Sequence, residues 1–374
     1  MKVMTVLGTR PEIIRLSSLI PLLDTNCDHI LVHTGQNFDH TLDEIFFKDL
    51  SVRAPDVNLG VRGGFAAQVG AILVGVEALL QEHRPDRLLI LGDTNSGLAA
   101  IVAKRLGISV YHMEAGNRCY DDRVPEEVNR RIIDHCSTVL MPYTNRSRAN
   151  LLREGILGER IYTTGNPIKQ VLDRFADRIS SSTILRELKL SPREFFLATM
   201  HRAENVDSPE RLRQLVDALG RVASHYGYPV VCSVHPRTAS RIERFGINAS
   251  RDGVRLLEPM NFFDFVSLEK AAFCCLSDSG TVQEEACIFG VPNVTMRDVT
   301  ERPETVECGS NFIAGTDPDA ILQAVGLVTK AGTAWVPPAE YLASSVAETC
   351  CKILLSARIP DLSELEWQAA SRPN

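Results

Sequence analysis

Short apolar runs alternate along this chain with longer segments in which apolar residues recur at helical spacing. In the first part of the chain, runs rich in Val, Ile and Leu occupy residues 2–8, 29–35, 87–93, 108–114, 138–143 and 160–166. This alternation is typical of βαβ units, in which right-handed crossovers produce a parallel sheet covered by helices. The pattern therefore predicts a Rossmann-like domain.

The rhythm stops after Asn166-Pro167, where a polar helical segment without a strand candidate extends to about Arg193. Further apolar runs follow at residues 195–201, 229–235, 254–260, 273–279, 292–298 and 311–315. Helical patterns such as 208–226 separate these runs. The second series therefore predicts a second Rossmann-like domain.

Two domains also fit the length of 374 residues, because one hydrophobic core seldom serves more than about 250–300 residues. We assign residues 1–167 to the first domain and 168–357 to the second. No strand follows the helical pattern at 345–357, so we expect this helix to cross back onto the first domain, and a C-terminal helix at about residues 358–374 to pack there as well. The expected fold is α/β, with two Rossmann-like domains that face a cleft.

Composition excludes several classes of function. A net charge of -7 and a pI near 5.8 argue against a surface that binds nucleic acid or an anionic membrane, because such a surface needs a stripe of basic residues. The N-terminal apolar run is too short for a signal peptide, and no later run approaches a membrane span, so we expect a cytoplasmic protein. The 10 cysteines include two adjacent pairs, Cys274-Cys275 and Cys350-Cys351, but no Cys-x-x-Cys, which indicates buried free thiols in place of disulfides or a metal site.

Carboxylates gather at the ends of two apolar runs. Asp93 ends one run and Glu114 the next, and further acidic residues follow at Asp121-Asp122 and Glu126-Glu127. In an open parallel sheet the carboxyl ends of successive strands open into one ligand crevice, so we expect Asp93 and Glu114 to face each other. Carboxylates in such a position indicate proton-transfer chemistry.

The first run ends in Gly8-Thr9-Arg10-Pro11. Pro11 suits the first turn of a helix, and Arg10 would project toward the cleft. A simple strand-to-helix turn is the alternative. Neither GxGxxG nor a Walker loop occurs in the chain, so a nicotinamide or ATP site would lack its phosphate cradle.

The segment Ser277–Thr281 lies between an apolar run and a helix, where free backbone N–H groups and the helix dipole can bind phosphate. Ordinary capping by Ser279 is the alternative. Glu285, in the same helix, could accept ribose hydroxyls or simply be solvated. The segment is therefore a candidate nucleotide site.

Two strand-end pairs, His201-Arg202 and His235 with Arg237, converge near this helix N-terminus, and Arg302 adds charge. A lone histidine is usually structural, but His-Arg pairs facing a helix N-terminus indicate a diphosphate site. Carboxylates on one wall and anion donors on the other suit acid–base work on a sugar held by its nucleoside diphosphate. The C2–H of such a sugar becomes acidic only as the diphosphate departs and leaves oxocarbenium character at C1, so both functions must act together.

Short motifs occur in order along nearly the whole chain. They are GTRPE at Gly8, GDT at Gly92, HMEAG at His112, PEE-x-NRR at Pro125, TGNP at Thr164, MHRAEN at Met200, SDSGT-x-QEE at Ser277 and ERPE at Glu301. With these motifs the chain resembles the non-hydrolysing UDP-N-acetylglucosamine 2-epimerase family. The resemblance implies a glycosyltransferase-B type fold without metal or nicotinamide cofactor, and a reaction that eliminates UDP to a 2-acetamidoglucal and re-adds it with inversion at C2.

The resemblance also implies roles for individual residues. The acid–base carboxylates would be Asp93, Glu114 and Glu126, and the diphosphate would be met by Arg10 and the catalytic His201. Phosphate would be held by Ser279, Gly280 and Thr281, the ribose by Glu285 and the uracil by Phe265. His235 and Arg302 would also bind the nucleotide, and Arg15 and Asn166 would bind substrate. No metal ligands are implied.

Three positions depart from the family pattern. Members acting on UDP-N-acetylglucosamine typically carry Lys where Arg15 stands, Gln-His where Gln36-Asn37 stands, and Gly-Leu-Arg where Gly116-Asn117-Arg118 stands. The Gln-His pair contributes to allosteric activation by substrate in that group, so this regulation is in doubt here. In these segments the chain looks closer to the branch that makes UDP-N-acetyl-L-fucosamine from its C2 epimer.

We therefore expect an isomerase that converts UDP-2-acetamido-2,6-dideoxy-L-talose to UDP-N-acetyl-L-fucosamine, and that forms a homodimer. The alternatives are a 2-epimerase acting on UDP-N-acetylglucosamine, a hydrolysing 2-epimerase that releases free sugar, and a glycosyltransferase of the same fold. A non-enzymatic sugar-nucleotide sensor is a further class, but it has no use for three strand-end carboxylates.

Overall fold

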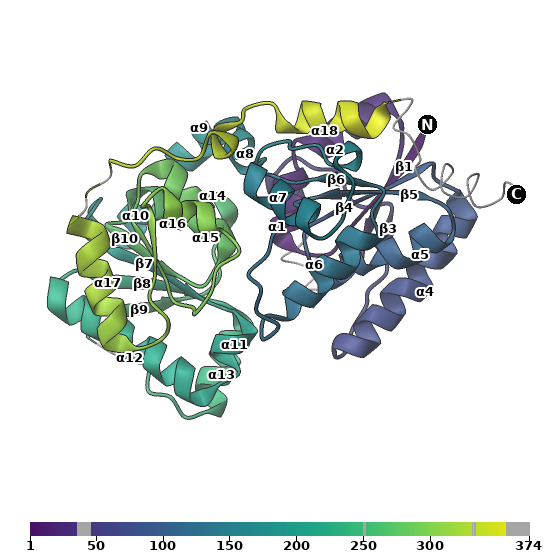
Figure 1. Cartoon of the computed structure of the whole chain (residues 1–374). Helices are drawn as coiled ribbons and strands as arrows, with labels where there is room; N and C mark the ends of the chain where they lie inside the picture. The colour runs from purple at the N-terminus through teal and green to yellow at the C-terminus, as the bar shows by residue number, and fades with distance from the viewer. Residues whose placement is uncertain (36–45, 250–251, 331, 333, 357–374) are drawn as a thin grey trace, which may run out of the picture. The chain divides into compact units, whose positions relative to one another are not determined.

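The chain forms two compact α/β units in the computed structural model, which describes residues 1–35, 46–249, 252–330, 332 and 334–356 (Figure 1). Unit 1 comprises Met1–Arg118, Pro125–Val171 and the C-terminal part of the chain from Ala343. Unit 2 comprises Cys119–Val124 and Leu172–Leu342. Each unit has its own sheet and its own hydrophobic core, and the two are described separately below.

Unit 1 contains a parallel sheet with the strand order β3-β2-β1-β4-β5-β6. Its strands are β1 (Lys2–Leu7), β2 (Asp28–His33), β3 (Val57–Asn58), β4 (Arg87–Leu91), β5 (Ser109–Met113) and β6 (Val139–Met141). Strand β1 is buried from Val3 to Leu7. Burial on both faces explains why the strands appear in the sequence as continuous apolar runs.

The helices of unit 1 are α1 (Arg10–Leu16), α2 (Leu19–Asn26), α4 (Phe65–His83), α5 (Ala100–Arg105), α6 (Pro125–Cys136), α7 (Asn145–Arg153), the start of α8 (Ile168–Arg174) and α18 (Val346–Leu355), with 3-10 turns η1 (Asn95–Ala99) and η2 (Gly158–Arg160). Helix α4 contributes Ile72, Val76 and Leu80 to the core against β1 and β4. This amphipathic packing positions the loops at the carboxyl edge of the sheet.

Unit 2 repeats the same architecture with the strand order β12-β11-β10-β7-β8-β9. Its strands are β7 (Phe196–Met200), β8 (Val230–Val234), β9 (Val254–Leu257), β10 (Cys274–Ser277), β11 (Asn293–Thr295) and β12 (Asn311–Ile313). Its helices are α9 (Ala176–Ser180), α10 (Ile184–Glu187), α11 (Ala203–Val206), α12 (Pro209–Tyr226), α13 (Pro236–Arg244), α14 (Phe262–Ala271), α15 (Gly280–Phe289), α16 (Pro303–Glu307) and α17 (Pro318–Lys330), with the turn η3 (Ala339–Leu342). The predicted α/β fold with two Rossmann-like domains is confirmed.

Both sheets reverse their strand order between the first strand of the unit and the fourth, that is, between β1 and β4 and between β7 and β10. Ligands of open parallel sheets bind outside the carboxyl ends of the strands at such a switch point. The residues that follow these four strands are therefore the first place to look for a site in each unit.

The last strand predicted for the first domain is wrong as a full strand. Residues 160–166 run beside β6, where Tyr162 N donates to Leu140 O at 2.9 Å and Thr164 N donates to Pro142 O at 3.0 Å. They form only an isolated bridge between Leu140 and Ile161. Pro142 has no N–H to donate in return, so the ladder cannot continue. The short β3, in contrast, was not among the predicted strands.

The division of the chain differs from the predicted domains in two segments. The described residues from Ala343 onward lie beyond the predicted boundary of the first domain but belong to unit 1, and their helix is the one expected to cross back; Cys119–Val124, predicted with the first domain, belongs to unit 2. Helix α18 packs on α2, and the Arg87 guanidinium donates to the Ser356 carbonyl oxygen at 2.7 Å. The C-terminal helix expected at about 358–374 lies outside the described residues.

The expectation that no apolar run approaches a membrane span needs a correction at α4. This helix has 19 residues and a mean hydropathy of 1.3, so length and composition alone would let it cross a membrane. Its inner face, however, belongs to the core of unit 1. It serves as the crossover helix between β3 and β4.

All 10 cysteines are free thiols. Six of them are buried and four are half-buried, the latter being Cys27, Cys119, Cys136 and Cys308. Their distribution over both cores fits the behaviour of cysteine as a small hydrophobic residue.

Candidate functional site

The switch point of unit 1 is organised by a buried glutamate. The Glu12 carboxylate, in the first turn of α1, accepts hydrogen bonds from Gly8 N at 3.0 Å, Thr9 Oγ1 at 2.7 Å and Thr94 Oγ1 at 3.2 Å. Burial raises the pKa of Glu12 to about 7 although these hydrogen bonds oppose the rise. Glu12 thus ties the end of β1 to the loop after β4, a role that the sequence analysis did not assign to it.

Arg10 is the first residue of α1 and is half-buried. Its guanidinium carbon lies 5.2 Å from the centroid of the Phe46 ring, which is a cation–π distance. The predicted strand-to-helix turn therefore holds a cationic group at the carboxyl edge of the sheet, as expected for a residue that meets an anion.

The Glu114 carboxylate, after β5, is held by three side chains. It forms an ion pair with Arg15 and accepts hydrogen bonds from Tyr143 Oη at 3.2 Å and Asn117 Nδ2 at 3.1 Å. The backbone of Glu114 has a left-handed φ of 64°, which is unusual for a non-glycine residue and often marks a functional position. Its side chain is 10% exposed, so the carboxylate is ordered and yet reachable.

Asp93, two residues beyond β4, is the second carboxylate of this edge. Arg130 of α6 donates to Asp93 Oδ2 from Nε at 2.8 Å, and the Asp93 side chain is 25% exposed. A Cβ placed on the neighbouring Gly92 would lie 3.8 Å from Glu114 Oε2, so the two carboxylates occupy the same edge of the sheet. The structure thus brings Asp93 and Glu114 together, each with its own arginine.

Glu126 lies half-buried in the first turn of α6. Arg130, the partner of Asp93, stands four residues later on the same helix, and residues at this spacing share a helix face. The adjacent Glu127 is completely buried and accepts from Arg130 Nη1 at 2.9 Å. Glu127 therefore supports Arg130, whereas Glu126 is the more accessible acid of the pair.

A buried network fixes the segment that carries Glu114. The Asp134 carboxylate contacts His112 Nδ1 at 2.8 Å and accepts from Arg118 Nη2 at 2.7 Å and from Gly116 N at 3.1 Å. Burial by itself would raise the pKa of Asp134, but the contacts with His112 and Arg118 outweigh it and hold the pKa below its usual value. The HMEAG motif is thus a rigid frame for its glutamate.

Asn166, assigned to substrate binding, is fully buried where the chain enters α8. Its Oδ1 accepts a hydrogen bond from Ile168 N at 3.0 Å. Within the described part of the chain its Nδ2 has no hydrogen-bond partner. Asn166 therefore shapes a turn and retains one amide donor.

In unit 2 the switch point is organised by Asp278, directly after β10. Its carboxylate accepts from the backbone N–H groups of His201 and Arg202, both at 3.0 Å, and from Asn205 Nδ2 at 3.1 Å. Burial opposes ionisation, but His201 and Arg202 overcome this effect and lower the pKa of Asp278 to about 2. Asp278 thus brings the MHRAEN motif to the start of α15, a role that the sequence analysis did not see.

The segment Ser279-Gly280-Thr281 begins α15. The alternative that Ser279 caps this helix through its side chain is wrong, because Ser279 makes no capping hydrogen bond and its Oγ instead lies 2.9 Å from Thr281 Oγ1. A Cβ at Gly280 would come within 2.8 Å of Glu301 Oε1, so a larger residue would require the Glu301 side chain to shift. The first turn of α15 thus has backbone N–H groups without a side-chain cap, as an anion site requires.

Two glutamates follow in α15. Glu284 is completely buried and forms an ion pair with Arg302, which the sequence analysis placed on the nucleotide side. Glu285, the predicted ribose acceptor, is 5% exposed and is therefore not the solvated residue of the alternative interpretation. Arg302 thus contacts α15, the helix whose first turn is the candidate phosphate site.

The remaining predicted residues of unit 2 differ in exposure. His201 has a side chain that is 38% exposed, with Nδ1 at 3.1 Å from Asp278 Oδ1. His235 is exposed and caps α13, because its Nδ1 accepts from Arg237 N at 3.2 Å. Phe265 is half-buried in α14 and packs against the core. The structure brings His201 to the α15 turn, whereas His235 has a structural role that the prediction did not include.

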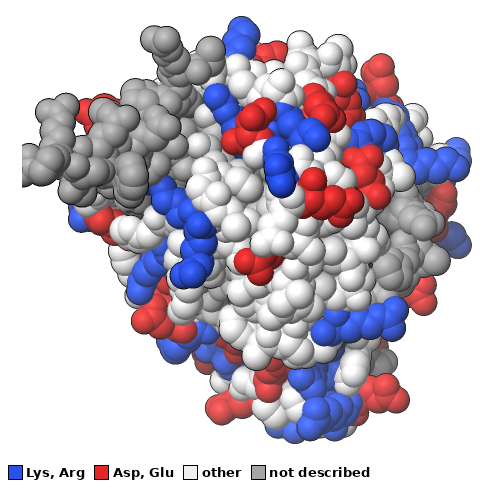
Figure 2. Space-filling model, turned by 90° about the vertical axis from the view of Figure 1, so that its right-hand side faces the viewer, with Lys and Arg blue, Asp and Glu red and all other residues white. Residues whose placement is uncertain are grey.

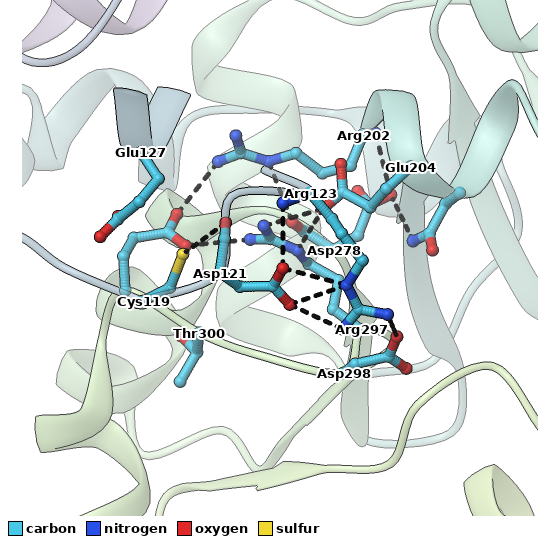
Figure 3. Close-up of polar contacts among 12 residues, drawn as sticks. Cys119, Asp121, Arg123, Glu127, Arg202, Glu204, Asp278, Arg297, Asp298 and Thr300 are labelled. Carbon is cyan, nitrogen blue, oxygen red and sulfur yellow. Dashed lines mark hydrogen bonds and ion pairs between the residues drawn. The ribbon is translucent and has the colours of Figure 1, made fainter. Parts of the chain in front are cut away.

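The segment Cys119–Val124 stands in the sequence between two parts of unit 1 but belongs to unit 2, and it carries a cluster of charged residues (Figure 3). Arg123 binds Asp121 Oδ2 from Nη2 at 2.6 Å and approaches Asp298 at 3.6 Å. Arg297, almost completely buried, pairs with Glu204 at 2.8 Å nearby. The loop from Asn117 to Arg123 is therefore split: Asn117 contacts Glu114, whereas Arg123 contacts groups of unit 2. Gln36-Asn37 lies outside the described residues.

Comparisons with known proteins agree with these features. The sequence model of the family described as UDP-N-acetylglucosamine 2-epimerase matches residues 23–355. The UDP-N-acetylglucosamine 2-epimerase of Methanocaldococcus jannaschii is 40% identical over 347 residues, which are 90% of this chain and 95% of that protein. The UDP-2,3-diacetamido-2,3-dideoxy-D-glucuronate 2-epimerase of Pseudomonas aeruginosa is 38% identical over 329 residues, covering 86% of this chain and 91% of its own.

A solved structure of the Methanocaldococcus jannaschii UDP-GlcNAc 2-epimerase, in complex with UDP-GlcNAc and UDP, has a TM-score of 0.90 at 39% identity. The two structures match over 95% of this chain and 99% of the Methanocaldococcus jannaschii chain. Fold and overall sequence thus agree with those of this relative over nearly the whole length of the chain. The protein is therefore an epimerase, an enzyme of the isomerase class, and belongs to the UDP-N-acetylglucosamine 2-epimerase family.

Proposed function

We propose that the protein catalyses the non-hydrolysing C2 epimerisation of a UDP-2-acetamido sugar, by elimination of UDP to a glycal and re-addition of UDP. The observation that carries this proposal is the pair of carboxylates Asp93 and Glu114 at one sheet edge, each beside an arginine and partly exposed. A general base must be ionised and reachable, and an arginine partner favours the ionised form.

In the proposed reaction a carboxylate removes the proton from C2 while the C1–O bond breaks and UDP departs. UDP then adds back to C1 as a proton returns to C2 from the opposite face, which inverts that carbon. Removal and return on opposite faces need two positioned acid–base groups, and Asp93, Glu114 and Glu126 are the candidates. We assign Arg10 and His201 to the departing diphosphate, because charge develops there in the transition state.

The nucleotide would be bound mainly by unit 2. The α15 turn of Ser279, Gly280 and Thr281 offers backbone N–H groups to phosphate, Glu285 would accept the ribose hydroxyls, and Phe265 would contact the uracil. Arg302 supports this turn through Glu284, whereas Asn166 retains a donor for substrate. These roles agree with the burial and contacts of the residues concerned.

Turnover in D2O tests the reaction type. We expect deuterium at C2 of the product, observed by NMR, because the base exchanges its proton with solvent before re-addition. Product without label at C2 would contradict the elimination mechanism. Accumulation of free UDP and free sugar in proportion to turnover would favour a hydrolysing epimerase.

For the sugar we propose conversion of UDP-2-acetamido-2,6-dideoxy-L-talose to UDP-N-acetyl-L-fucosamine. Two positions at which the chain departs from the family pattern, Arg15 and Asn117, both contact the Glu114 carboxylate. The nucleotide motifs, in contrast, are intact. Two changes beside a proposed catalytic carboxylate support a changed sugar with the same nucleotide.

The second candidate is epimerisation of UDP-N-acetylglucosamine, which the name of the relative from Methanocaldococcus jannaschii favours. The kcat/KM values for the two UDP-sugars on one enzyme preparation decide between them. We expect the 6-deoxy-L-sugar to be converted far faster. Equal values, or a preference for UDP-N-acetylglucosamine, would return the protein to the second candidate.

We also propose a homodimer that forms through the outer face of α4. Phe65 is 61% exposed and Val74 71% exposed on this face. Small residues, Ala67, Ala71 and Ala78, are exposed at helical spacing beside Val74. Figure 2, which views the side where Figure 1 shows α4 and α5, has a broad area with few charged groups. Such a face suits a second copy, because an isologous contact pairs identical patches.

Light scattering coupled to size exclusion tests the dimer. The wild type should have twice the mass of one chain at about 10 µM, well above typical dissociation constants of stable interfaces. Val74→Glu should yield a monomer. Leu327→Glu, a change at a residue of α17 that is 51% exposed, is the matched control and should leave the dimer intact. A monomeric wild type would overturn this proposal.

A further inference from the structure

A second acidic residue is buried behind Glu285. Glu269 lies in α14 and is completely buried. Leu268 of the same helix and Ala272, which follows the helix, belong to an apolar cluster that also contains Val282 and Ala286 of α15. Glu269 and Glu285 are thus placed between two packed helices, at the side of a hydrophobic core.

Neither carboxyl oxygen of Glu269 receives a hydrogen bond from a donor in the described part of the chain. An isolated buried carboxylate costs several kcal/mol, so Glu269 must be neutral or paired. The group within hydrogen-bonding reach is the Glu285 carboxyl. Two carboxylates at such a distance repel, whereas one proton between them converts the contact into a hydrogen bond.

Among the described residues, no positive charge acts on Glu269 that could replace this proton. Glu285 of α15 is the charged group that acts on Glu269, and β10 presents the buried Cys275, whose pKa is itself raised by burial and by Glu269. Helix α10 contributes Ile184 to the apolar cluster, and Arg178 of α9 lies over the ring of Phe263 near the start of α14. Lys270 is exposed, and so is Arg193, which donates to the Ala272 carbonyl oxygen.

Burial, followed by repulsion from Glu285, raises the pKa of Glu269 well above its usual value. Both causes act in the direction that the geometry requires. The raised pKa and the burial both favour one shared proton on the pair, and Glu269 is the member placed more deeply in the core.

We propose that Glu269 is a positioning residue for nucleotide binding, which donates a hydrogen bond from its protonated carboxyl group to Glu285 and so orients the Glu285 carboxylate. This inference rests on the proposed role of Glu285 as acceptor of the ribose hydroxyls. The carboxylate would use one oxygen toward Glu269 and present the other to the ribose. The chemical class that it recognises is a vicinal diol on the nucleotide, and 2′-deoxy nucleotides are the natural comparison.

Calorimetric titration with UDP and with 2′-deoxy-UDP tests this role. Glu269→Gln keeps a donor toward Glu285, so its UDP affinity should stay within about twofold of wild type. Glu269→Leu removes the donor and should weaken UDP binding by about ten- to a hundredfold, the range for a hydrogen bond to a charged group. It should weaken 2′-deoxy-UDP binding less. Glu243→Gln, at an exposed residue of α13, is the control for loss of an acidic side chain.

The pH dependence is a second readout, which remains available if Glu269→Leu does not fold. UDP affinity of the wild type should fall at alkaline pH, where the pair loses its shared proton, whereas Glu269→Gln should keep its affinity. The same pH dependence in both proteins, or wild-type UDP affinity in Glu269→Leu, would overturn the role of Glu269. Failure of the wild type to bind UDP at all would instead contradict the proposed function.

Discussion

The two units have the same strand order but use an aspartate at the same topological place in opposite ways. Asp93 follows β4 in unit 1, and Asp278 follows β10 in unit 2. The Asp93 side chain is 25% exposed and pairs with an arginine, whereas that of Asp278 is 0% exposed and accepts backbone N–H groups. The Asp93 carboxylate is therefore accessible to a ligand, whereas the Asp278 carboxylate accepts hydrogen bonds from within the fold.

This difference explains what each switch point can bind. In unit 1 the Asp93 and Glu114 carboxylates are partly exposed, which suits proton transfer. In unit 2 Asp278 is used within the fold, and the proposed anion site consists of the N-terminus of α15 and the partly exposed His201 side chain. The same topology therefore supports either chemistry, and the partners of a single aspartate decide which one.

A second pair of buried carboxylates sharpens the comparison. Glu12 in unit 1 and Asp278 in unit 2 both accept backbone N–H groups at a switch point, yet burial raises the pKa of Glu12 to about 7 while that of Asp278 is lowered to about 2. The donors to Glu12 are neutral, whereas His201 and Arg202 bring positive charge to Asp278. Nearby cations, more than hydrogen bonds, decide whether the cost of burial is overcome.

The largest expected effect concerns the carboxylates of unit 1. Asp93→Asn, Glu114→Gln and Glu126→Gln should each lower kcat by about 10² to 10⁴, the usual contribution of positioned acid–base groups. UDP affinity, measured by calorimetry, should be retained because the nucleotide is assigned to unit 2. Near wild-type turnover in all three variants would contradict the proposal that unit 1 carries the acid–base groups while unit 2 binds the nucleotide.

Asp278→Asn should act on stability first. It removes the charge that His201 and Arg202 balance inside the fold, and loss of one partner of a buried pair costs about 3–5 kcal/mol. Urea denaturation should detect this loss, and UDP binding should fall with it. Asp93→Asn is the matched control and should change the unfolding free energy by about 1 kcal/mol or less, as for partly exposed pairs. Equal losses of unfolding free energy in the two variants would contradict the proposed difference between Asp278 and Asp93.

The pH dependence of stability should have opposite signs for the two buried carboxylates. Because the folded pKa of Glu12 is about 7 against a usual value of 4.5, its contribution falls by about 3 kcal/mol as pH rises from 4.5 to 7. Glu12→Gln should abolish that fall. Asp278 stabilises above its usual pKa of 3.8 and loses this effect as pH falls toward 2. Denaturation curves at several pH values, with wild type beside Glu12→Gln and Asp278→Asn, measure both slopes; parallel curves would contradict the assignment.

The smallest expected effect is at Asn117. Asn117→Leu removes one hydrogen bond to Glu114, which stabilises by about 0.5–1.5 kcal/mol, so kcat should fall by about three- to tenfold. UDP affinity should not change, because the residue is in unit 1. Steady-state kinetics and calorimetry on the same preparation check the prediction. A loss of UDP binding without a change in kcat would place the residue with the nucleotide.

Local sequence was sufficient for the fold class and for much of the candidate site. Apolar runs and helical periods belong to single elements, so eleven of the described strands could be predicted without knowing their neighbours, among them β1, β4 and β10. The places of Asp93, Glu114 and Ser279 also followed, because residues after parallel strands share one edge. Only two residues of β3 pair, too few to leave a pattern.

The tertiary structure alone decided the partners of these residues. Arg15 reaches Glu114 across 99 positions of the chain, and Arg130 reaches Asp93 across 37. Such pairs depend on which helix covers which strand end, and hydrophobic spacing does not encode that choice. The same holds for Glu269: its burial beside Glu285 arises from the packing of α14 on α15. Sequence thus determined which groups lie at each sheet edge, and the long-range contacts determined their charge, orientation and accessibility, because these properties depend on neighbours that only folding brings together.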